Sequence, residues 1–523
     1  MSTREDPVIE NAPVPRSGGA LKAGSVGLLA VLFMATANAA PITAMTGNTP
    51  ISVGFGNGIG TPAGFLVATV VLSIFAVGYV AMARHVTTTG AFYGFISHGL
   101  GQVWGMASGL LATMAYVVFE ASLVGIFSSF AKGTVETLHG PELSWLVYAV
   151  LCVAVAGVLG YFDISVSGKI HGVFLISEVV LLSLLALGIL FTGGGPDGLM
   201  PEAINPLNAF EAAPTSADGA VVGLAGIGLF FAFWSWVGFE TTAVYGEESR
   251  NPKKIVPRAT MIAVIGLGLF YTFVSWMVIA QNGETAALAA SRGETGNSFD
   301  LFFVPTEQVL GGFALDVYKI LTVVGSFGCA LAFHNAASRY LYALGREAPN
   351  ERVRGTLGGT HATHQSPHVA SLIQTIITAV IVLGFYLLQD PTDAAPDVAY
   401  FYLYGLMAIL GTMAILIVQA ITSIAVVWYF HVRKQHPETA HWWRTLLAPI
   451  LGAAGMLYVV YLLWDNLDFA AGAAAGSPVF KATPWIVLAT FVIGVVYSLW
   501  LRSANPATYA EIGRTVMEEA HER

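Results

Sequence analysis

Residues 221–252 read VVGLAGIGLFFAFWSWVGFETTAVYGEESRNP, an apolar stretch that is interrupted near its middle by Gly238 and by the carboxylate of Glu240. About 20 apolar residues suffice for a helix to cross a bilayer. Glycine lets a helix unwind, and irregular backbone at membrane depth persists only where it lines a cavity or is buried in protein. The stretch therefore predicts a membrane helix that is broken in two, with an ordinary glycine kink as the alternative.

A second stretch has the same character. Residues 26–56 read VGLLAVLFMATANAAPITAMTGNTPISVGFG, and Asn38, Pro41, Gly47, Asn48 and Pro50 interrupt the apolar run. A proline inside a helix removes a backbone hydrogen bond. The two interrupted stretches are the first and the sixth along the chain, so they head two successive groups of five. Corresponding broken helices in two halves indicate inverted repeats around a binding site near the membrane midplane.

The composition agrees with a membrane protein. Only 11% of the 523 residues are charged and 55% are hydrophobic, whereas soluble domains carry about 25% charged residues. Cys152 and Cys329 fall inside apolar runs and are interpreted as small core residues, and the net charge of -9 argues against a nucleic-acid partner. We predict an all-α polytopic protein of about twelve transmembrane helices, near residues 24–52, 61–83, 102–131, 143–161, 169–192, 221–247, 258–281, 314–345, 369–389, 398–430, 444–465 and 484–502.

The basic residues predict the orientation. With the N-terminus in the cytoplasm, nineteen of the 23 Lys and Arg residues fall on the cytoplasmic side, and only Lys132, Arg292, Lys319 and Lys481 fall outside. Cytoplasmic loops of membrane proteins carry such an excess of positive charge. We therefore expect a multi-pass protein of the inner membrane with both termini in the cytoplasm.

Four segments resemble the amino acid–polyamine–organocation (APC) superfamily. FFAFWSWVGFETTAVYGEESRNPKKIVPRA (230–259) is similar to its sixth helix and following loop. AASRYLYALGREA (336–348) with HQSPHVA (364–370) resembles its eighth helix and the start of its ninth, and APITAMTGNTP (40–50) resembles the broken first helix of a bacterial subgroup. The resemblance implies a leucine-transporter-like 5+5 inverted repeat.

The same resemblance implies a division of the chain. Residues 1–20 are expected to form a disordered cytoplasmic tail, and residues 21–431 the transport core, with repeats at about 21–195 and 220–431. Residues 432–503 would hold the peripheral helices 11 and 12, and residues 504–523 a second cytoplasmic tail.

The helix breaks are the candidate substrate site. Free backbone N–H groups at a half-helix N-terminus bind a carboxylate, and free carbonyls at the other break can take an ammonium group. The predicted substrate-binding residues are Ala39, Ala40, Pro41, Ile42, Thr43, Trp234, Val237, Gly238 and Phe239. Trp234 is included because the sixth helix is also similar to that of arginine/agmatine antiporters, in which this tryptophan packs on the substrate. The alternative for Ala39 and Ala40 is tight helix packing through small residues.

Three carboxylates lie inside predicted membrane helices, where ionised groups are costly and frequently functional. Glu178 aligns with a lysine that proton-coupled relatives carry in the fifth helix, and Glu240 with a glutamate that takes part in the pH response of the antiporters. The resemblance thus implies proton-coupling roles for Glu178 and Glu240, with buried structural carboxyls as the alternative. Glu120 is a weaker candidate that we expect to face a polar outer vestibule.

Ser326 and His334 in the eighth helix are further candidates. The Gly-Ser-Phe-Gly-Cys run around Ser326 lacks the adjacent Ser/Thr pair with which sodium-coupled relatives bind Na⁺, so the resemblance favours proton coupling. Histidine titrates near neutral pH, and the alternative for His334 is a hydrogen-bonded histidine between helices.

These features predict a secondary active transporter of an amino acid or related amine that works by alternating access, as a proton-coupled symporter or exchanger. The alternatives are a sodium-coupled or uncoupled carrier of a polyamine or ethanolamine-like organocation, or a channel or sensor on the same fold. We expect no enzyme, cofactor or metal site, because no clustered catalytic motif or phosphate-binding glycine loop is found, and His361, His364 and His368 lack ligand partners nearby. The sequence does not indicate an oligomeric state.

Overall fold

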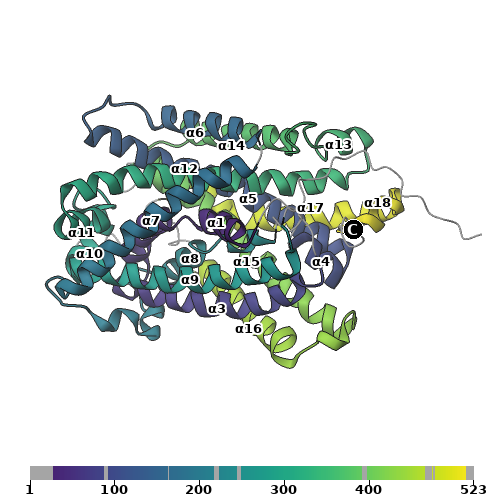
Figure 1. The fold of residues 1–523 in the computed structure, drawn as a ribbon, viewed down its shortest axis with the longest axis horizontal. Helices are drawn as coiled ribbons and strands as arrows, with labels where there is room; N and C mark the ends of the chain where they lie inside the picture. Colours follow the sequence, from purple (N-terminus) through teal and green to yellow (C-terminus); the bar gives the residue numbers. More distant parts are fainter. Residues whose placement is uncertain are drawn as a thin grey trace, which may run out of the picture.

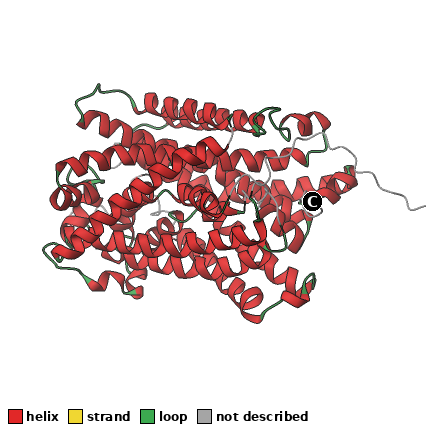
Figure 2. Cartoon of the chain, in the orientation of Figure 1, coloured by secondary structure: helices red, strands yellow, loops and turns green. Residues whose placement is uncertain are grey.

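The computed structural model describes residues 27–86, 92–162, 164–216, 223–243, 249–391, 397–465, 474 and 477–513. Within these ranges the regular elements are helices (Figure 2), apart from an isolated bridge between Gly195 and Gly198 and a bridge residue at Ser249. The expected tail at residues 1–20 and the acidic loop residues Glu247 and Glu248 lie outside the described residues.

The helices fall into α-helices and short 3-10 or π turns, and most of the α-helices run roughly alongside one another (Figure 1). The α-helices are α1 (Leu28–Ala39), α2 (Pro41–Ile51), α3 (Thr61–Ala83), α4 (Phe92–Leu100), α5 (Gln102–Thr137), α6 (Trp145–Gly160), α7 (Ile164–Thr192), α8 (Ala225–Trp234), α9 (Pro252–Asn282), α10 (Glu284–Ser291), α11 (Asp300–Leu310), α12 (Gly312–Arg346), α13 (Glu351–Thr356), α14 (His368–Leu388), α15 (Gly405–Val427), α16 (Ala448–Asp465), α17 (Pro478–Ala504) and α18 (Pro506–Glu511). The shorter turns are η1 (Ser52–Gly56), η2 (Gly58–Gly60), η3 (Pro201–Ile204), η4 (Pro206–Phe210), η5 (Phe239–Thr242), η6 (Val398–Tyr404), η7 (Trp428–Val432), η8 (Pro437–Thr439) and η9 (Trp442–Leu447).

Nine helical segments in the described part of the chain are long and apolar enough to cross a membrane. They coincide with nine of the twelve predicted stretches. The other three stretches are also helical, but α6 and α8 are shorter apolar helices and the first stretch is divided into α1 and α2. The shortfall at the first and sixth stretches thus has the physical cause that the sequence predicted, since a broken helix yields two short pieces.

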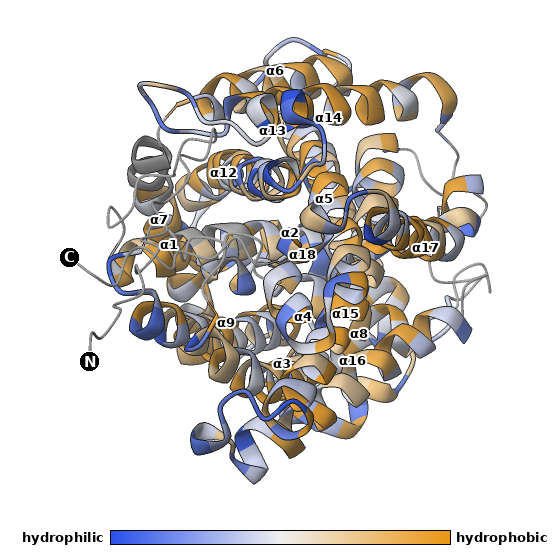
Figure 3. Cartoon of the chain, turned by 90° about the vertical axis from the view of Figure 1, so that its right-hand side faces the viewer, coloured by the Kyte–Doolittle hydropathy of each residue, from blue (hydrophilic) through white to orange (hydrophobic). Residues whose placement is uncertain are grey.

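The broken helices occupy the middle of the molecule. Seen end-on, α2 lies inside a ring that includes α12, α5, α15 and α9 (Figure 3), and α2 packs directly against α7, α8, α9 and α12. Burial follows this arrangement. The apolar window of α5 is 89% buried within the protein, whereas those of α14 and α17 are each 28% buried. The outward faces of these two helices are apolar, as contact with lipid requires.

The two ends of the molecule carry different connections. One end holds α10 and α11, and the opposite end holds α4, α13 and α18 (Figure 1). In the segment after residue 503, α18 continues the chain and Ile512 is fully buried. The long helices therefore connect one end built from α10 and α11 with another built from α4, α13 and α18.

Candidate functional site

The break in the first membrane helix is a single residue. Ala40 adopts φ 39° and ψ 80°, which ends α1, and α2 begins at once with Pro41. Proline is well suited to the first helical position because it has no N–H to leave unpaired. The predicted unwound segment from Ala39 to Thr43 is therefore too long, since Pro41, Ile42 and Thr43 belong to the first turn of α2.

The chain around this break is buried, and only some of its polar groups have hydrogen-bond partners. The Tyr271 hydroxyl donates to the carbonyl of Ala39 at 2.9 Å. Thr43 is 2% exposed, and its hydroxyl has no hydrogen-bond partner in the part of the chain that the structure describes. A buried hydroxyl without a partner is costly, so Thr43 offers a polar contact to a solute at the break.

The break in the sixth membrane helix is longer. Helix α8 ends at Trp234, the chain turns through residues 235–238, and a 3-10 turn follows at Phe239–Thr242. Gly238 has φ 119°, a conformation that side chains rarely adopt, so glycine is required here. Val237, Gly238 and Phe239 thus lie at an interruption of the helix that is buried in protein.

Hydrogen bonds connect the two broken helices. The Asn48 amide donates to the Ser235 hydroxyl at 2.8 Å, and the Tyr404 hydroxyl donates to the side-chain oxygen of Asn48. The Trp234 indole N–H in turn donates to the Tyr404 hydroxyl at 3.2 Å, and its ring stacks on Phe119 with the centroids 4.4 Å apart. Trp234 therefore lies at the junction of α2, α8 and η6.

Glu178 lies against the first break. Its carboxylate oxygen Oε2 accepts a hydrogen bond from the backbone N–H of Ile42 at 3.3 Å, and the residue is 4% exposed. The facing residue on α12 is Gly325, where an added Cβ would lie 2.5 Å from Glu178 Oε1. The carboxyl thus occupies a space between α2, α7 and α12, at the N-terminus of α2 where the helix dipole favours negative charge.

Glu240 lies at the second break. It is fully buried, and its carboxylate accepts hydrogen bonds from the Tyr116 hydroxyl at 2.9 Å and from the Gly238 N–H at 3.0 Å. The Tyr79 hydroxyl donates to the backbone carbonyl of Glu240 at 2.9 Å. Glu240 therefore ties the interrupted backbone of the sixth helix to α3 and α5.

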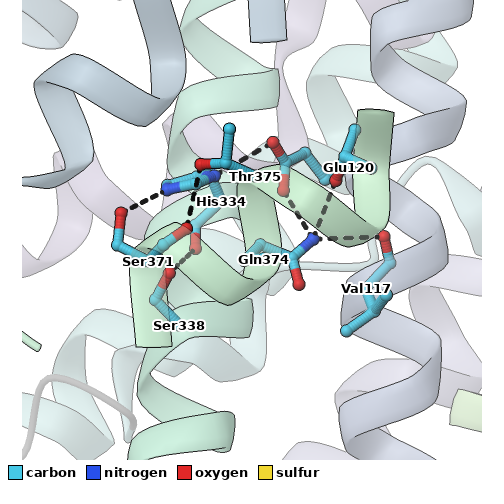
Figure 4. Close-up of polar contacts among 8 residues, drawn as sticks. Val117, Glu120, His334, Ser338, Ser371, Gln374 and Thr375 are labelled. Carbon is cyan, nitrogen blue, oxygen red and sulfur yellow. Dashed lines mark hydrogen bonds and ion pairs between the residues drawn. The ribbon is translucent and has the colours of Figure 1, made fainter. Parts of the chain in front are cut away.

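Glu120 and His334 form a separate polar network (Figure 4). His334 Nδ1 lies 3.0 Å from Glu120 Oε1, and His334 Nε2 lies 2.7 Å from the Ser371 hydroxyl. The Gln374 amide donates to Glu120 Oε2 at 2.6 Å. Glu120 and His334 are both fully buried between α5, α12 and α14. The expectation that Glu120 faces an outer vestibule is wrong, because helix packing encloses the carboxylate.

Ser326 hydrogen-bonds within its own helix. Its hydroxyl donates to the Thr322 carbonyl at 2.6 Å. Among the described residues no group of three or more His, Cys, Asp or Glu side chains could hold a metal ion. The site is therefore made of backbone, hydroxyl, indole and carboxyl groups.

Asn48, Ser235 and Tyr404 were not among the residues that the sequence singled out for the site. Their hydrogen bonds join positions as far apart as 356 residues in the chain. The only local signal was that Asn48 and Ser235 are polar residues within the two interrupted apolar stretches.

Comparisons with known proteins find sequence similarity to membrane transport proteins. The amino acid permease family model matches residues 26–497. The methylthioribose transporter of Bacillus subtilis is 22% identical over 432 residues, which cover 80% of this chain and 84% of that protein. The branched-chain amino acid permease BcaP of Lactococcus lactis is 20% identical over 345 residues, covering 63% and 70% respectively.

One solved structure that aligns with this chain is that of Mhp1, a nucleobase-cation-symport-1 family transporter, in a closed conformation with bromovinylhydantoin bound. The alignment has a TM-score of 0.49 and 11% sequence identity, and it covers 90% of this chain and 99% of that one. The family match spans nearly the whole chain and includes both broken helices. The chain belongs to the amino acid permease family of the APC superfamily and is a multi-pass membrane transporter.

Proposed function

We propose that this protein is a secondary active transporter that moves an amino acid or a related amine across the cytoplasmic membrane by alternating access, coupled to protons through Glu178. The proposal includes twelve membrane crossings, two inverted five-helix repeats and cytoplasmic termini. The observation that carries it is the hydrogen bond from the Ile42 N–H to the carboxylate of Glu178 at the break of the first helix.

The N-terminus of α2 supports a site for a substrate carboxylate. Free N–H groups and the helix dipole make such an end favourable for an anion. In the described structure the carboxylate of Glu178 uses the N–H of Ile42. Protonation of Glu178 removes its charge and weakens its hold on this N–H, which then becomes available to the substrate. Proton binding and substrate binding are thereby coupled at a single amide.

The second break supplies the other half of the proposed site. Carbonyl groups at Val237, Gly238 and Phe239 lie outside regular α-helix, and such carbonyls attract a substrate ammonium group. The Trp234 ring offers an apolar and cation-attracting face beside them. Because the relatives transport methylthioribose in one case and branched-chain amino acids in the other, a substrate screen should include both kinds of compound alongside polyamines and ethanolamine.

The test uses the purified protein. A thermal-shift screen first identifies a ligand, since binding to the folded state raises the unfolding temperature. Counterflow of that labelled ligand in liposomes then separates a carrier from a channel, because a channel shows no counterflow. With an inward proton gradient the wild type should accumulate the ligand, whereas Glu178→Gln should lose accumulation by about tenfold or more and keep exchange at zero gradient.

Glu240→Gln is the matched carboxyl variant, and we expect it to shift the pH profile of binding while preserving accumulation. Full accumulation by Glu178→Gln would show that Glu178 is structural. Accumulation that requires sodium and ignores the proton gradient would replace the proton with sodium, and binding without any transport would indicate a sensor.

A further inference from the structure

The chain after the last long helix is fastened to the end of the molecule that carries α4 and α13. Asn505 caps α18 by accepting a hydrogen bond from the Thr508 N–H at 3.1 Å. Ile512 then inserts between helices, fully buried, in an apolar cluster with Tyr93, Met106 and Leu501. Burying an isoleucine side chain contributes favourably to the docked state, so this segment is held in place by packing.

Gly513 adds a polar attachment. Its N–H donates to the carboxylate of Glu347 at 3.1 Å, and the Tyr93 hydroxyl donates to the same carboxylate. Glu347 is 5% exposed, and a buried carboxylate requires such donors. Gly513 has φ 68°, and an added Cβ would lie 2.2 Å from Ser97 side-chain atoms. Only glycine fits this contact without displacement.

The docked segment contacts one face of α4. Tyr93 and Ser97 are four residues apart, so they lie on the same side of this helix. The other side of α4 faces the core. The rings of Phe92 and Phe95 lie 5.6 Å and 5.1 Å from the ring of Tyr79, centroid to centroid. The face of α4 with Tyr93 and Ser97 also packs on α5, where Gly105 approaches Ser97 and Gly109 approaches the Tyr93 ring. Helix α4 therefore lies between α5 and the C-terminal segment on one side and Tyr79 on the other.

Tyr79 connects α4 to the transport site. Its hydroxyl donates to the backbone carbonyl of Glu240 at the break of the sixth helix. An unbroken series of contacts thus runs from Gly513 through Tyr93, α4 and Tyr79 to Glu240. Figure 1 shows α18 and α4 together at the same end of the molecule.

We propose that residues 505–513 form an intramolecular latch that holds α4 against the core and keeps this end of the transport pathway closed. Releasing the latch frees α4 to move with Tyr79 and favours opening at this end, which is the cytoplasmic end under the proposed orientation. The latch lies outside both helix breaks, so it regulates access without touching the substrate.

Two variants should release the latch, and a third serves as control. Ile512→Ser removes the apolar anchor, and Gly513→Ala introduces the Cβ that Ser97 excludes. Glu511→Gln alters an exposed residue of the same segment and should leave the latch closed. Hydrogen exchange of the full-length protein, followed in peptides covering 505–513 and 92–100, reports the latch and α4 separately.

We expect both release variants to raise exchange in the two peptides roughly tenfold or more. A cysteine at Ala83, which is 4% exposed and one turn beyond Tyr79 on α3, should also react faster with maleimide in these backgrounds. If exchange rises across the whole chain in Ile512→Ser, that variant is generally unfolded, and Gly513→Ala decides the matter.

Two results would overturn the latch. The first is fast exchange in 505–513 with unchanged exchange in 92–100 and unchanged labelling at Ala83→Cys, because the segment would then be released without effect on α4. The second is the lack of any difference between the release variants and the Glu511→Gln control in the exchange of 505–513. Neither hydrogen exchange nor maleimide labelling requires a substrate, so a failure of the latch proposal can be distinguished from a failure of the proposed transport function.

Discussion

At the scale of single residues, Trp234 and Trp236 lie two positions apart but have different surroundings. Trp234 lies at the junction of the two broken helices, whereas Trp236 is fully enclosed and donates its indole N–H to the Val264 carbonyl at 3.1 Å. We predict that Trp234→Ala weakens substrate binding tenfold or more, while Trp236→Ala chiefly destabilises the protein by about 3–5 kcal/mol. Ligand titrations and thermal unfolding of both variants check this. Equal losses of affinity would remove Trp234 from the substrate site.

The buried pair of Glu120 and His334 makes a second prediction at this scale. Removing one member of a buried pair leaves the other uncompensated and costs about 3–5 kcal/mol, whereas removing both costs less than the sum. Glu120→Gln and His334→Asn should therefore each lower thermal stability strongly, and the double variant should be clearly more stable than additivity allows. Additive losses would mean that the hydrogen bond between them contributes little.

How much of the site was predictable also becomes clear at single residues. The apolar surroundings of Glu178 in the sequence predicted a buried carboxyl, but not its contact with Ile42, which lies 136 residues away. For Glu120, the sequence failed to predict that the carboxyl is buried. Nothing in its own helix reveals that His334 and Gln374 enclose it, since both partners come from other helices. Residue type indicated which groups were candidates for the site, and only tertiary packing determined which of these groups meet.

At the scale of elements, the interruptions of the first and sixth helices were predictable because proline and glycine act on the local backbone. The number of residues in each break was not predictable. In the sequence Pro41 indicates a break in the first helix, but α2 begins at Pro41 immediately after Ala40. The break in the first helix is therefore limited to one residue. The sixth-helix break is longer: α8 already ends at Trp234, and Gly238 at φ 119° prevents the helix from resuming at that residue.

The contact between α7, α12 and α2 gives a prediction for these elements. A Cβ at Gly325 would lie 2.5 Å from Glu178 Oε1 and 2.7 Å from Ile42 Cγ2. Gly325→Ala should therefore push the carboxylate off the N–H of Ile42 and reduce gradient-driven accumulation by about tenfold or more. Gly384→Ala in α14 is the matched control, because an added Cβ there meets no atom within 4 Å. Unchanged accumulation in Gly325→Ala would show that the position of the carboxylate is not critical.

At the scale of the whole molecule, the placement of the two ends relative to the membrane depends on charge. The asymmetry of Lys and Arg predicts that the end with α10 and α11 faces outward and the end with α4 and α13 faces the cytoplasm. Cysteine labelling tests this, because Cys152 and Cys329 are only 1% and 3% exposed and give little background. Gly194, in the loop after α7, is a poor position for an introduced cysteine on the outer side, because its φ of 84° and the nearby Gly198 carbonyl disfavour any side chain.

Glu202 in η3 and Ala362 after α13 are better positions, because both are exposed and lie near opposite ends of the long helices. A membrane-impermeant maleimide should label Glu202→Cys in intact cells and Ala362→Cys only after the membrane is opened. The reverse pattern would place the N-terminus outside. Labelling of both from one side would require an even number of crossings between them. The proposed topology places three crossings between these positions, through the sixth, seventh and eighth membrane helices, and three is odd. Labelling of both from one side would therefore reject the twelve-helix topology. It would also reject the pairing of the first and sixth helices as corresponding members of two inverted repeats.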